Sequence, residues 1–376
     1  MTSTESNPQT AAETIASVGD TSGRSASVAE TIASVGENES LRRTIARLNR
    51  GHYELVGPGD DCAVIRAEHG SFVVTTDTLV EDHDFKLCWS SWYDLGWKAV
   101  ATNISDVAAM GAMPTVLVVA LVTPATTLVS DLEAFADGLR EACLQLAPGC
   151  AVVGGDLASG SQVVISVTAH GDLQGRAAVL RSGAKPGDVL AIAGTLGRAA
   201  CGLELLLSDN ADAASAYDDW VAVQRRPQPP IAMGVTAADA GATSMLDLSD
   251  GLAKDASRIA RASGVDLVIE ASQLFGFEAV LEGAAQALSL ANPHLVELGK
   301  PNLAAEEYCR KWVLTGGEDH GLLATFPAEQ TLPRGFKRIG VVRAAASAPT
   351  AYLASNLAGE SRETAVTDLG WDSVRG

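Results

Sequence analysis

Strand-like and helix-like segments alternate along most of this chain, and this alternation limits its fold more than any other feature. Short apolar runs bounded by glycine or proline predict strands, whereas apolar residues spaced three or four positions apart predict helices. The predicted strands lie at 72–76, 115–122, 150–153, 163–169, 189–193, 244–248, 267–270, 312–314, 322–326 and 339–342. The predicted helices lie at 92–110, 128–146, 198–207 and 252–262, with a loop or frayed helix at 209–220. This order is typical of an α/β (α+β) protein.

The length of the chain predicts two domains, because 376 residues exceed what one hydrophobic core usually serves. A glycine-rich connection at 171–187 marks the expected boundary. We therefore expect an N-terminal domain over 37–176 and a C-terminal α/β domain over 177–376. The segment 1–36 repeats the octapeptide AETIASVG and carries few large apolar side chains, so it is predicted to be a disordered tail.

The balance of charge and the cysteine pattern limit the partners and the location. The net charge of −19 argues against nucleic acid and anionic membranes, which need clustered Lys and Arg. The longest uninterrupted apolar run, 116–122, is far shorter than the ~20 residues of a membrane-spanning helix. Six scattered cysteines without a Cys-x-x-Cys pair favour free thiols in a reducing compartment. We expect a cytoplasmic protein.

Carboxylates gather in five short clusters at glycine turns or at the ends of predicted strands. The clusters occupy 57–61, 75–77, 154–156, 247–250 and 316–319. Any one of them is ordinary turn or helix-capping chemistry. Three of them directly follow apolar strands, where ligand crevices form in α/β sheets, and together they predict one binding site.

Asp106 provides a separate argument, because it lies on a predicted helix rather than at a turn. It shares an i, i+4 stripe with Lys98 and Thr102. Lys98 and Asp106 are eight residues apart, roughly 12 Å along a helix, so they cannot neutralise one another directly. We expect another cation beside Asp106, and the alternative is an exposed position on an outer face.

Magnesium fits this inventory better than zinc or calcium, because it prefers hard oxygen ligands, takes few carboxylates per ion and keeps water and phosphate oxygens in its shell. A nucleotide is the natural partner. The sequence contains neither G-x-x-x-x-G-K-[ST] nor G-x-G-x-x-G, so the phosphates are expected to be held through metal ions. Arg181, on a glycine-rich turn, is a candidate phosphate ligand or an ordinary solvated cation. No G-x-S-x-G elbow supports Ser-His-Asp catalysis.

Seven segments resemble, in order, the motifs of the thiamine-monophosphate kinase family, within the superfamily that includes aminoimidazole ribonucleotide synthetase. They read GPGDDCAVI, VVTTDTLVE, WKAVATNISDVAAMGAMP, VVGGDLASG, LRSGAKPGD, LDLSDGL and LTGGEDHGL. The likeness runs from about Gly36 to Trp371. It implies an N-terminal mixed sheet that pairs in a homodimer, a C-terminal α/β sandwich, and binding of ATP and several Mg²⁺ ions at the acidic loops. The implied product is thiamine diphosphate.

The resemblance also implies roles for individual residues. The implied metal ligands are Asp61, Thr75, Thr76, Asp77, Asp106, Asp156, Asp247 and Asp250. The implied ATP contacts are Gly155, Arg181 and Ser249, and the implied contacts to the thiamine moiety are Asp84, Glu318 and Trp371. Asp84 stands where the family usually has a histidine, and His83 precedes it by one residue. Either of the two is therefore a candidate for that contact.

The expected reaction is direct in-line transfer of the γ-phosphoryl group of ATP to a phosphate oxygen of the acceptor. That oxygen is already anionic near neutral pH, so no general base is required. Metal ions bridging carboxylates and phosphates would overcome the repulsion between the two anions, which makes Asp77, Asp106 and Asp156 the least replaceable residues. The alternatives are another ATP-using synthetase of the superfamily that releases ADP and phosphate, or a nucleotide-binding regulatory protein without turnover.

Overall fold

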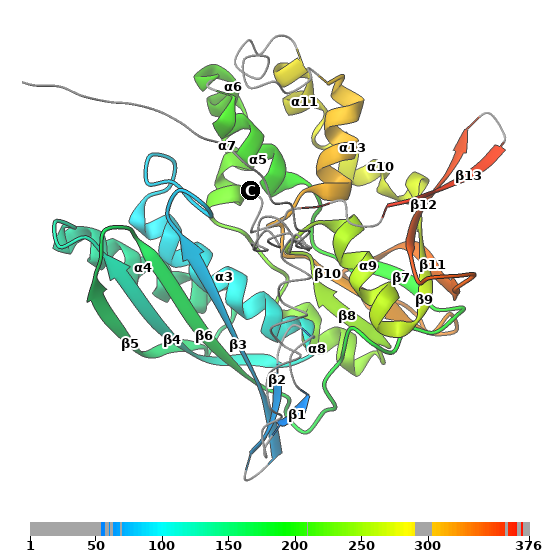
Figure 1. Ribbon diagram of the computed structural model, residues 1–376, viewed down its shortest axis with the longest axis horizontal. Helices are drawn as coiled ribbons and strands as arrows, with labels where there is room; N and C mark the ends of the chain where they lie inside the picture. Colours follow the sequence, from blue (N-terminus) through cyan, green and yellow to red (C-terminus); the bar gives the residue numbers. More distant parts are fainter. Residues whose placement is uncertain are drawn as a thin grey trace, which may run out of the picture.

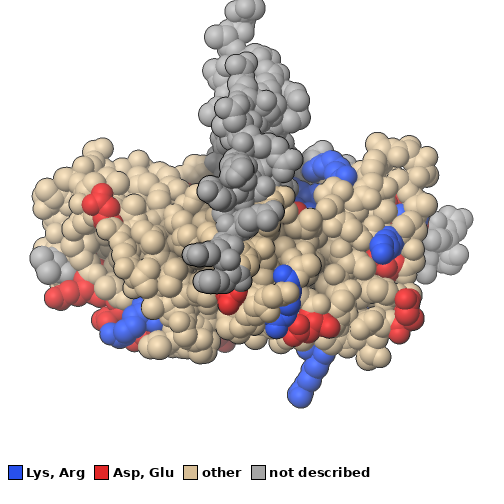
Figure 2. All heavy atoms as spheres, turned by 90° about the horizontal axis from the view of Figure 1, so that it is seen from below, with Lys and Arg blue, Asp and Glu red and all other residues tan. Residues whose placement is uncertain are grey.

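The structure is a computed structural model that describes residues 54–56, 60, 63–67, 70–208, 210–289, 303–357, 360–366 and 370. The predicted tail and two candidate site residues, Asp61 and Trp371, lie outside these residues. No described helix combines the length and hydropathy that a membrane span requires. On the face shown in Figure 2, acidic and basic side chains are interspersed on a largely uncharged surface.

The first half forms a mixed six-stranded sheet in the order β1-β2-β3-β6-β4-β5. Its strands are β1 (Glu54–Val56), β2 (Ala63–Ala67), β3 (Gly70–Val80), β4 (Met113–Thr123), β5 (Ala151–Ser159) and β6 (Val164–Asp172). Among the described strands of this sheet, only β4 and β5 pair in parallel. Helices α3 (Trp92–Ala109) and α4 (Val129–Leu146) cover one face of this sheet (Figure 1).

The second half forms a seven-stranded sheet in the order β13-β12-β9-β11-β7-β10-β8. Its strands are β7 (Val189–Ala193), β8 (Ser244–Asp247), β9 (Val265–Glu270), β10 (Leu322–Phe326), β11 (Phe336–Ala344), β12 (Ala351–Leu357) and β13 (Glu360–Ala365). Its helices are α5 (Arg198–Leu207), α6 (Ala211–Ala216), α7 (Asp218–Arg225), α8 (Ala232–Asp239), α9 (Leu252–Ser263), α10 (Ala271–Ala279), α11 (Glu282–Ser289) and α13 (Ala305–Thr315). The predicted mixed α/β architecture is confirmed.

Helix α3 lies between the two halves of the molecule. It packs on β3, β4 and β6 of the first sheet and also contacts α7, α8 and β8 of the second half. Its sequence is apolar or small almost all round, and nearly every residue from Leu95 to Ala109 is buried. Gly234 on α8 permits the close approach, because a Cβ there would lie 2.0 Å from the Ala108 carbonyl oxygen. The polar residues of α3 are therefore held at a junction of both halves.

Three local predictions differ from the structure. Residues 312–314 lie in α13 rather than in a strand, because three adjacent apolar residues cannot distinguish a buried strand from the wide buried face of a helix. The predicted loop or frayed helix at 209–220 contains α6, capped by the Asn210 side chain, and the first three residues of α7. Asp77 and Asp156 lie inside β3 and β5, not at their ends, because both strands continue through polar and glycine residues.

Candidate active site

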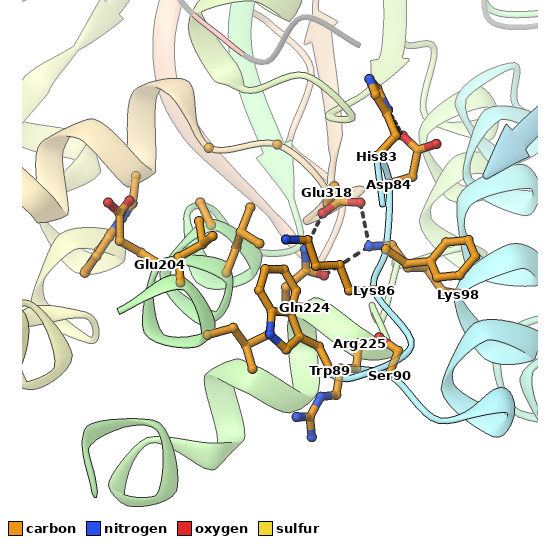
Figure 3. A pocket seen from close by; sticks show the side chains of 18 of the residues that line it. His83, Asp84, Lys86, Trp89, Ser90, Lys98, Glu204, Gln224, Arg225 and Glu318 are labelled. Atoms are coloured by element: carbon orange, nitrogen blue, oxygen red, sulfur yellow. Dashed lines mark hydrogen bonds and ion pairs between the residues drawn. The ribbon is translucent and has the colours of Figure 1, made fainter. Parts of the chain in front are cut away.

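Two adjoining cavities lie between the halves of the molecule. The first, of about 750 Å³, is here called the acidic cleft, and it is lined by Thr75, Thr76, Asp77, Thr78, Leu79, Val80, His83, Asp84, Thr102, Asp106, Arg181, Asp247, Ser249, Asp250, Arg258, Glu318 and His320. The second, of about 650 Å³, is here called the aromatic pocket (Figure 3). Its walls include Phe85, Trp89, Leu203 and Trp312. The two cavities share His83, Asp84 and Glu318.

Most of the candidate residues line the acidic cleft although they are far apart in the sequence. Ten do so: Thr75, Thr76, Asp77, Asp84, Asp106, Arg181, Asp247, Ser249, Asp250 and Glu318. They come from β3, α3, the end of β8 and the loops after β3, β6, β8 and α13. The fold therefore brings the separate acidic clusters of the sequence to one place.

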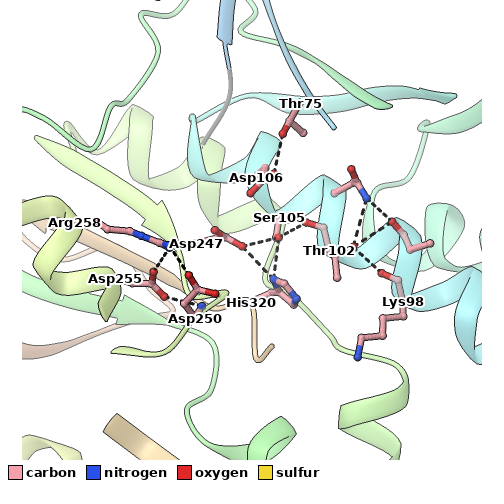
Figure 4. A network of polar contacts seen from close by, with 12 residues as sticks. Thr75, Lys98, Thr102, Ser105, Asp106, Asp247, Asp250, Asp255, Arg258 and His320 are labelled. Carbon is pink, nitrogen blue, oxygen red and sulfur yellow. Dashed lines mark hydrogen bonds and ion pairs between the residues drawn. The ribbon is translucent and has the colours of Figure 1, made fainter. Parts of the chain in front are cut away.

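Asp106 faces the cleft from α3. The Thr75 hydroxyl on β3 donates a hydrogen bond of 2.9 Å to Asp106 Oδ2 (Figure 4). Lys98, two turns earlier on the same helix, instead forms an ion pair with Glu318. Lys98 therefore pairs with Glu318 and not with Asp106, as the spacing along the helix predicted. Thr76 points to the opposite face of β3 from Thr75, and its hydroxyl donates to the Val167 carbonyl.

Asp247, the last residue of β8, is buried and held by two neighbours. Its Oδ2 lies 2.9 Å from the Ser105 hydroxyl and 3.1 Å from His320 Nδ1. Although burial favours the neutral acid, these contacts lower the pKa of Asp247. Burial likewise disfavours a charged His320, but the bond to Asp247 and its negative charge raise the histidine pKa above its ordinary value. The pair is therefore best described as an ion pair that orients the Asp247 carboxylate.

Asp250 lies in a network of cations from α9. Its Oδ2 is 3.0 Å from Lys254 Nζ and 2.5 Å from Arg258 Nη2. Arg258 also bonds the fully buried Asp255 at 2.7 Å, and Asp255 accepts the backbone N–H of Asp250. This part of the cleft therefore holds positive charge next to a candidate metal ligand.

Asp77 projects from the middle of β3 on the same face as Thr75. Although its side chain remains open to the cleft, loss of hydration among the surrounding groups raises the pKa of Asp77, and the charges of Asp84 and Asp247 raise it further. Carboxylates that repel one another in this way gain from a bound cation.

Gly155 and Asp156 are not brought to the cleft of their own chain. They lie on β5, which is separated from β3 by β6 and β4. The register aligns Asp156 with Ala120, Ser166 and Thr78, so its side chain points to the sheet face opposite to that of Asp77. Three strand spacings amount to about 14 Å. Asp156 therefore cannot share a ligand with Asp77 within one chain.

The donors of the cleft suit a hard cation. They are mainly carboxylates and hydroxyls, together with the imidazoles of His83 and His320, and no described cysteine is among them. No three acidic, histidine or cysteine side chains among the described residues are close enough to form a ready-made metal cluster. Mg²⁺ characteristically takes one or two protein carboxylates and completes its shell with water and phosphate oxygens. The residues present therefore fit Mg²⁺ that arrives with a nucleotide.

The loop after α13 connects the site to three other elements. Glu318 and His320 adopt left-handed backbone conformations, with φ of 67° and 50°. Asp319 between them is buried, accepts the Thr195 hydroxyl at 2.7 Å and accepts the backbone N–H groups at the start of α5. Non-glycine residues in this region of backbone space are uncommon and gather at functional sites. The side chains of Glu318, Asp319 and His320 therefore each bind a different neighbouring element.

Sequence reasoning did not identify Ser105, Gln224, Arg258 and His320 as site residues. Ser105 continues the stripe of Lys98 and Thr102 on α3, which is a signal that could have indicated it. His320 follows the GGED segment directly. Gln224 and Arg258 carry no local signal, because their partners are brought close only by the fold.

His320→Gln is expected to lower the free energy of unfolding by about 1–3 kcal/mol in magnesium-free buffer, because Asp247 loses a buried charged partner. The folded-state pKa of His320 is raised from 6.5, so its contribution is complete below about pH 6.5 and is lost as pH rises through the folded value. Denaturant unfolding of both proteins from pH 5.5 to 9 measures this. A difference that grows with pH would contradict the ion pair.

The fold and the cleft define the class of protein as AIR synthase-like. Residues 59–173 match the family described as "AIR synthase related protein, N-terminal domain". The hydrogenase maturation protein HypE shares the fold, with a TM-score of 0.53 at 18% identity over 85% of this chain and 92% of that one.

More similar proteins identify the family. The thiamine-monophosphate kinase of Mycobacterium tuberculosis is 43% identical over 305 residues, which are 79% of this chain and 83% of that protein. That of Bacillus subtilis is 36% identical over 73% of this chain and 78% of that protein. AaThiL complexed with AMPPCP and TMP superposes with a TM-score of 0.71 at 28% identity over 92% of this chain and 99% of that one. The chain belongs to the thiamine-monophosphate kinase family, which confirms the resemblance drawn from its motifs.

Proposed function

We propose that this protein transfers the γ-phosphoryl group of ATP to thiamine monophosphate and releases thiamine diphosphate and ADP. The observation that carries the proposal is the junction of the two cavities at Glu318. An aromatic pocket suits the rings of thiamine, and an adjoining cleft of oxygen donors suits phosphates with their cations. The similarity to AaThiL complexed with AMPPCP, an ATP analogue, and TMP supports both ligands.

Magnesium is part of this proposal. Asp77, Asp106, Asp247 and Asp250 line the cleft and, with Thr75, Thr76 and the predicted ligands Asp61 and Asp156, are the candidates to hold it. Bound Mg²⁺ would supply positive charge that screens the phosphates from one another and from the carboxylates.

The residues of the chain would bind and orient two anions for direct in-line transfer. Arg181 and Ser249, both in the cleft, are the proposed ATP contacts with Gly155, and Glu318, Asp84 or His83, and Trp371 are the proposed contacts to the thiamine moiety. The attacking phosphate oxygen carries its own negative charge, so no side chain is needed to remove a proton. His320 is occupied with Asp247 through Nδ1, which agrees with a mechanism without a histidine base.

A homodimer is also proposed. Strand β5 ends the order of the first sheet and is exposed along its whole length, with Val153 and Leu157 about 60% exposed. An edge strand with exposed apolar side chains is a surface that usually pairs with another chain. Pairing there would bury β5 and offer a route for Asp156 to reach the cleft of the second copy.

The test is to incubate the protein with ATP, Mg²⁺ and thiamine monophosphate and to separate the products. Thiamine diphosphate and ADP in equal amounts are expected. ADP with free phosphate and no thiamine diphosphate would favour another superfamily synthetase. Binding of ATP without any turnover would favour the regulatory alternative. The cytoplasmic location stays a prediction, based on the scattered cysteines.

A further inference from the structure

We infer that Lys98 and Gln224 are positioning residues, which fix the Glu318 carboxylate at the junction of the two cavities and thereby set the affinity for the acceptor. This inference rests on the proposed function, in which Glu318 contacts the thiamine moiety. It assigns a task to two buried polar side chains, one on α3 and one on α7.

The three side chains form a closed ring of short contacts (Figure 3). Lys98 Nζ lies 2.6 Å from Glu318 Oε1 and donates to Gln224 Oε1 at 3.0 Å. Gln224 Nε2 donates to Glu318 Oε2 at 2.6 Å. Both carboxylate oxygens are therefore held by different donors, which leaves the carboxylate no free rotation.

The ring holds Glu318 from behind. The Lys98 side chain is 3% exposed, whereas that of Glu318 is 29% exposed and lines both cavities. Charge-assisted bonds of this kind are about twice as strong as neutral ones and are directional. The carboxylate therefore presents its exposed edge to a ligand, while Lys98 and Gln224, which also line the aromatic pocket, direct these donors at Glu318.

The backbone of Glu318 is fixed independently of the ring. Its φ of 67° places it in the left-handed region, and its N–H donates to the Ser249 carbonyl at 2.9 Å. A Cβ on Gly317 would lie 2.4 Å from the same carbonyl oxygen, so the preceding residue has no room for a side chain. Only the side-chain torsions of Glu318 remain to be set, and the ring sets them.

The ring also balances charge where an anion must pass. The acceptor bears phosphate at one end, and a lone carboxylate at the junction would repel it. Lys98 neutralises Glu318 there, so the carboxylate can accept a hydrogen bond or face the thiazolium cation without adding net negative charge to the cleft. Lys98→Met removes the positive charge that balances Glu318, whereas Gln224→Leu removes only a hydrogen bond that orients the Glu318 carboxylate.

Steady-state kinetics of Lys98→Met and Gln224→Leu test the inference. We expect the KM for thiamine monophosphate to rise about tenfold in Lys98→Met and three- to tenfold in Gln224→Leu, with the KM for ATP changed less than about twofold. Gln224→Glu keeps the shape but loses the donor to Glu318, so it should raise the acceptor KM at least as much as Gln224→Leu. A role in packing alone would leave Gln224→Glu close to wild type and would overturn the inference.

A double-mutant cycle separates positioning from other effects of Lys98. Glu318→Gln alone should raise the acceptor KM, and adding Lys98→Met to it should raise the KM by less than about twofold more, because Lys98 acts through Glu318. Full additivity would overturn the inference. Arg310→Met, which removes a cation paired with Glu278 outside both cavities, is the matched control and should leave both KM values unchanged.

Two further outcomes distinguish the inference from the function on which it rests. Wild-type protein that makes no thiamine diphosphate overturns both. Wild-type turnover with normal acceptor KM in Lys98→Met and Gln224→Leu overturns the inference alone. Thermal unfolding identifies any variant that has lost its fold. If Lys98→Met or Gln224→Leu is such a variant, the acceptor KM values of the isosteric variants Glu318→Gln and Gln224→Glu test the inference instead.

Discussion

Asp106→Asn should lower kcat at least about a hundredfold, with a larger loss at limiting magnesium. The substitution keeps the size of the side chain and an oxygen for Thr75, but it removes the negative charge that makes Asp106 a ligand for a divalent cation. Initial rates are to be measured across a magnesium titration with ATP and thiamine monophosphate saturating. The apparent magnesium requirement should rise together with the loss of kcat.

Asp94→Asn is the matched control for this substitution. Asp94 lies in the first turn of the same helix, where it completes the capping box with Ser91 and pairs with Arg226, and it lines neither cavity. It should lower stability by about 1 kcal/mol and leave the magnesium dependence unchanged. Near-normal turnover of Asp106→Asn at limiting magnesium would show that Asp106 holds no catalytic cation.

Asp156→Asn should be similarly inactive alone, and mixing it with Asp106→Asn should restore activity. If the partner subunit supplies Asp156, a mixed dimer has one cleft with both substitutions and one cleft with neither. Random pairing then restores roughly a quarter of the wild-type sites in the unfractionated mixture and about half in purified mixed dimers. Co-expression of the two variants with different tags, followed by purification of mixed dimers and the product assay, measures this.

A second mixture provides the control. Asp106 and Asp247 both line the cleft of one chain, so mixed dimers of Asp106→Asn and Asp247→Asn have a damaged residue in each cleft and should stay inactive. A fully active monomer in solution would contradict the dimer. An inactive mixture of Asp106→Asn with Asp156→Asn would mean that Asp156 does not act across the interface.

Local patterns predicted much of the fold. The bounds of β7, α5 and β10 agree with the predictions, because each is a short, strongly patterned segment between clear breakers. The predicted strand at 312–314 was wrong because its apolar run is too short to show a period. The strands β12 and β13 were missed, since β12 alternates weakly and β13 consists mostly of polar and charged residues.

The candidate site was predictable only in part, because many of its residues contact partners that lie far away in the sequence. Asp77, Asp106 and Asp247 carried local signals, and the fold brings them to one cleft. The contact between Lys98 and Gln224 spans 126 residues, and that between Ser105 and His320 spans 215. Such partners depend on how the halves pack, which a local pattern does not contain. Asp156 would be a further step away, because only the proposed dimer would bring it to a cleft.

Helix α3, buried between the two halves, fixes the distance between the two cavities as well as the positions of the side chains that it carries. Lys98 at the aromatic pocket and Asp106 in the acidic cleft are separated by eight residues of continuous helix, which corresponds to about 12 Å. A helix packed on both sides cannot stretch or slide by part of a turn without disrupting its contacts. In the proposed function, this fixes the distance between the rings and the phosphates of the acceptor. We therefore expect an acceptor with a longer or shorter link between ring and phosphate to be out of register with the γ-phosphoryl group.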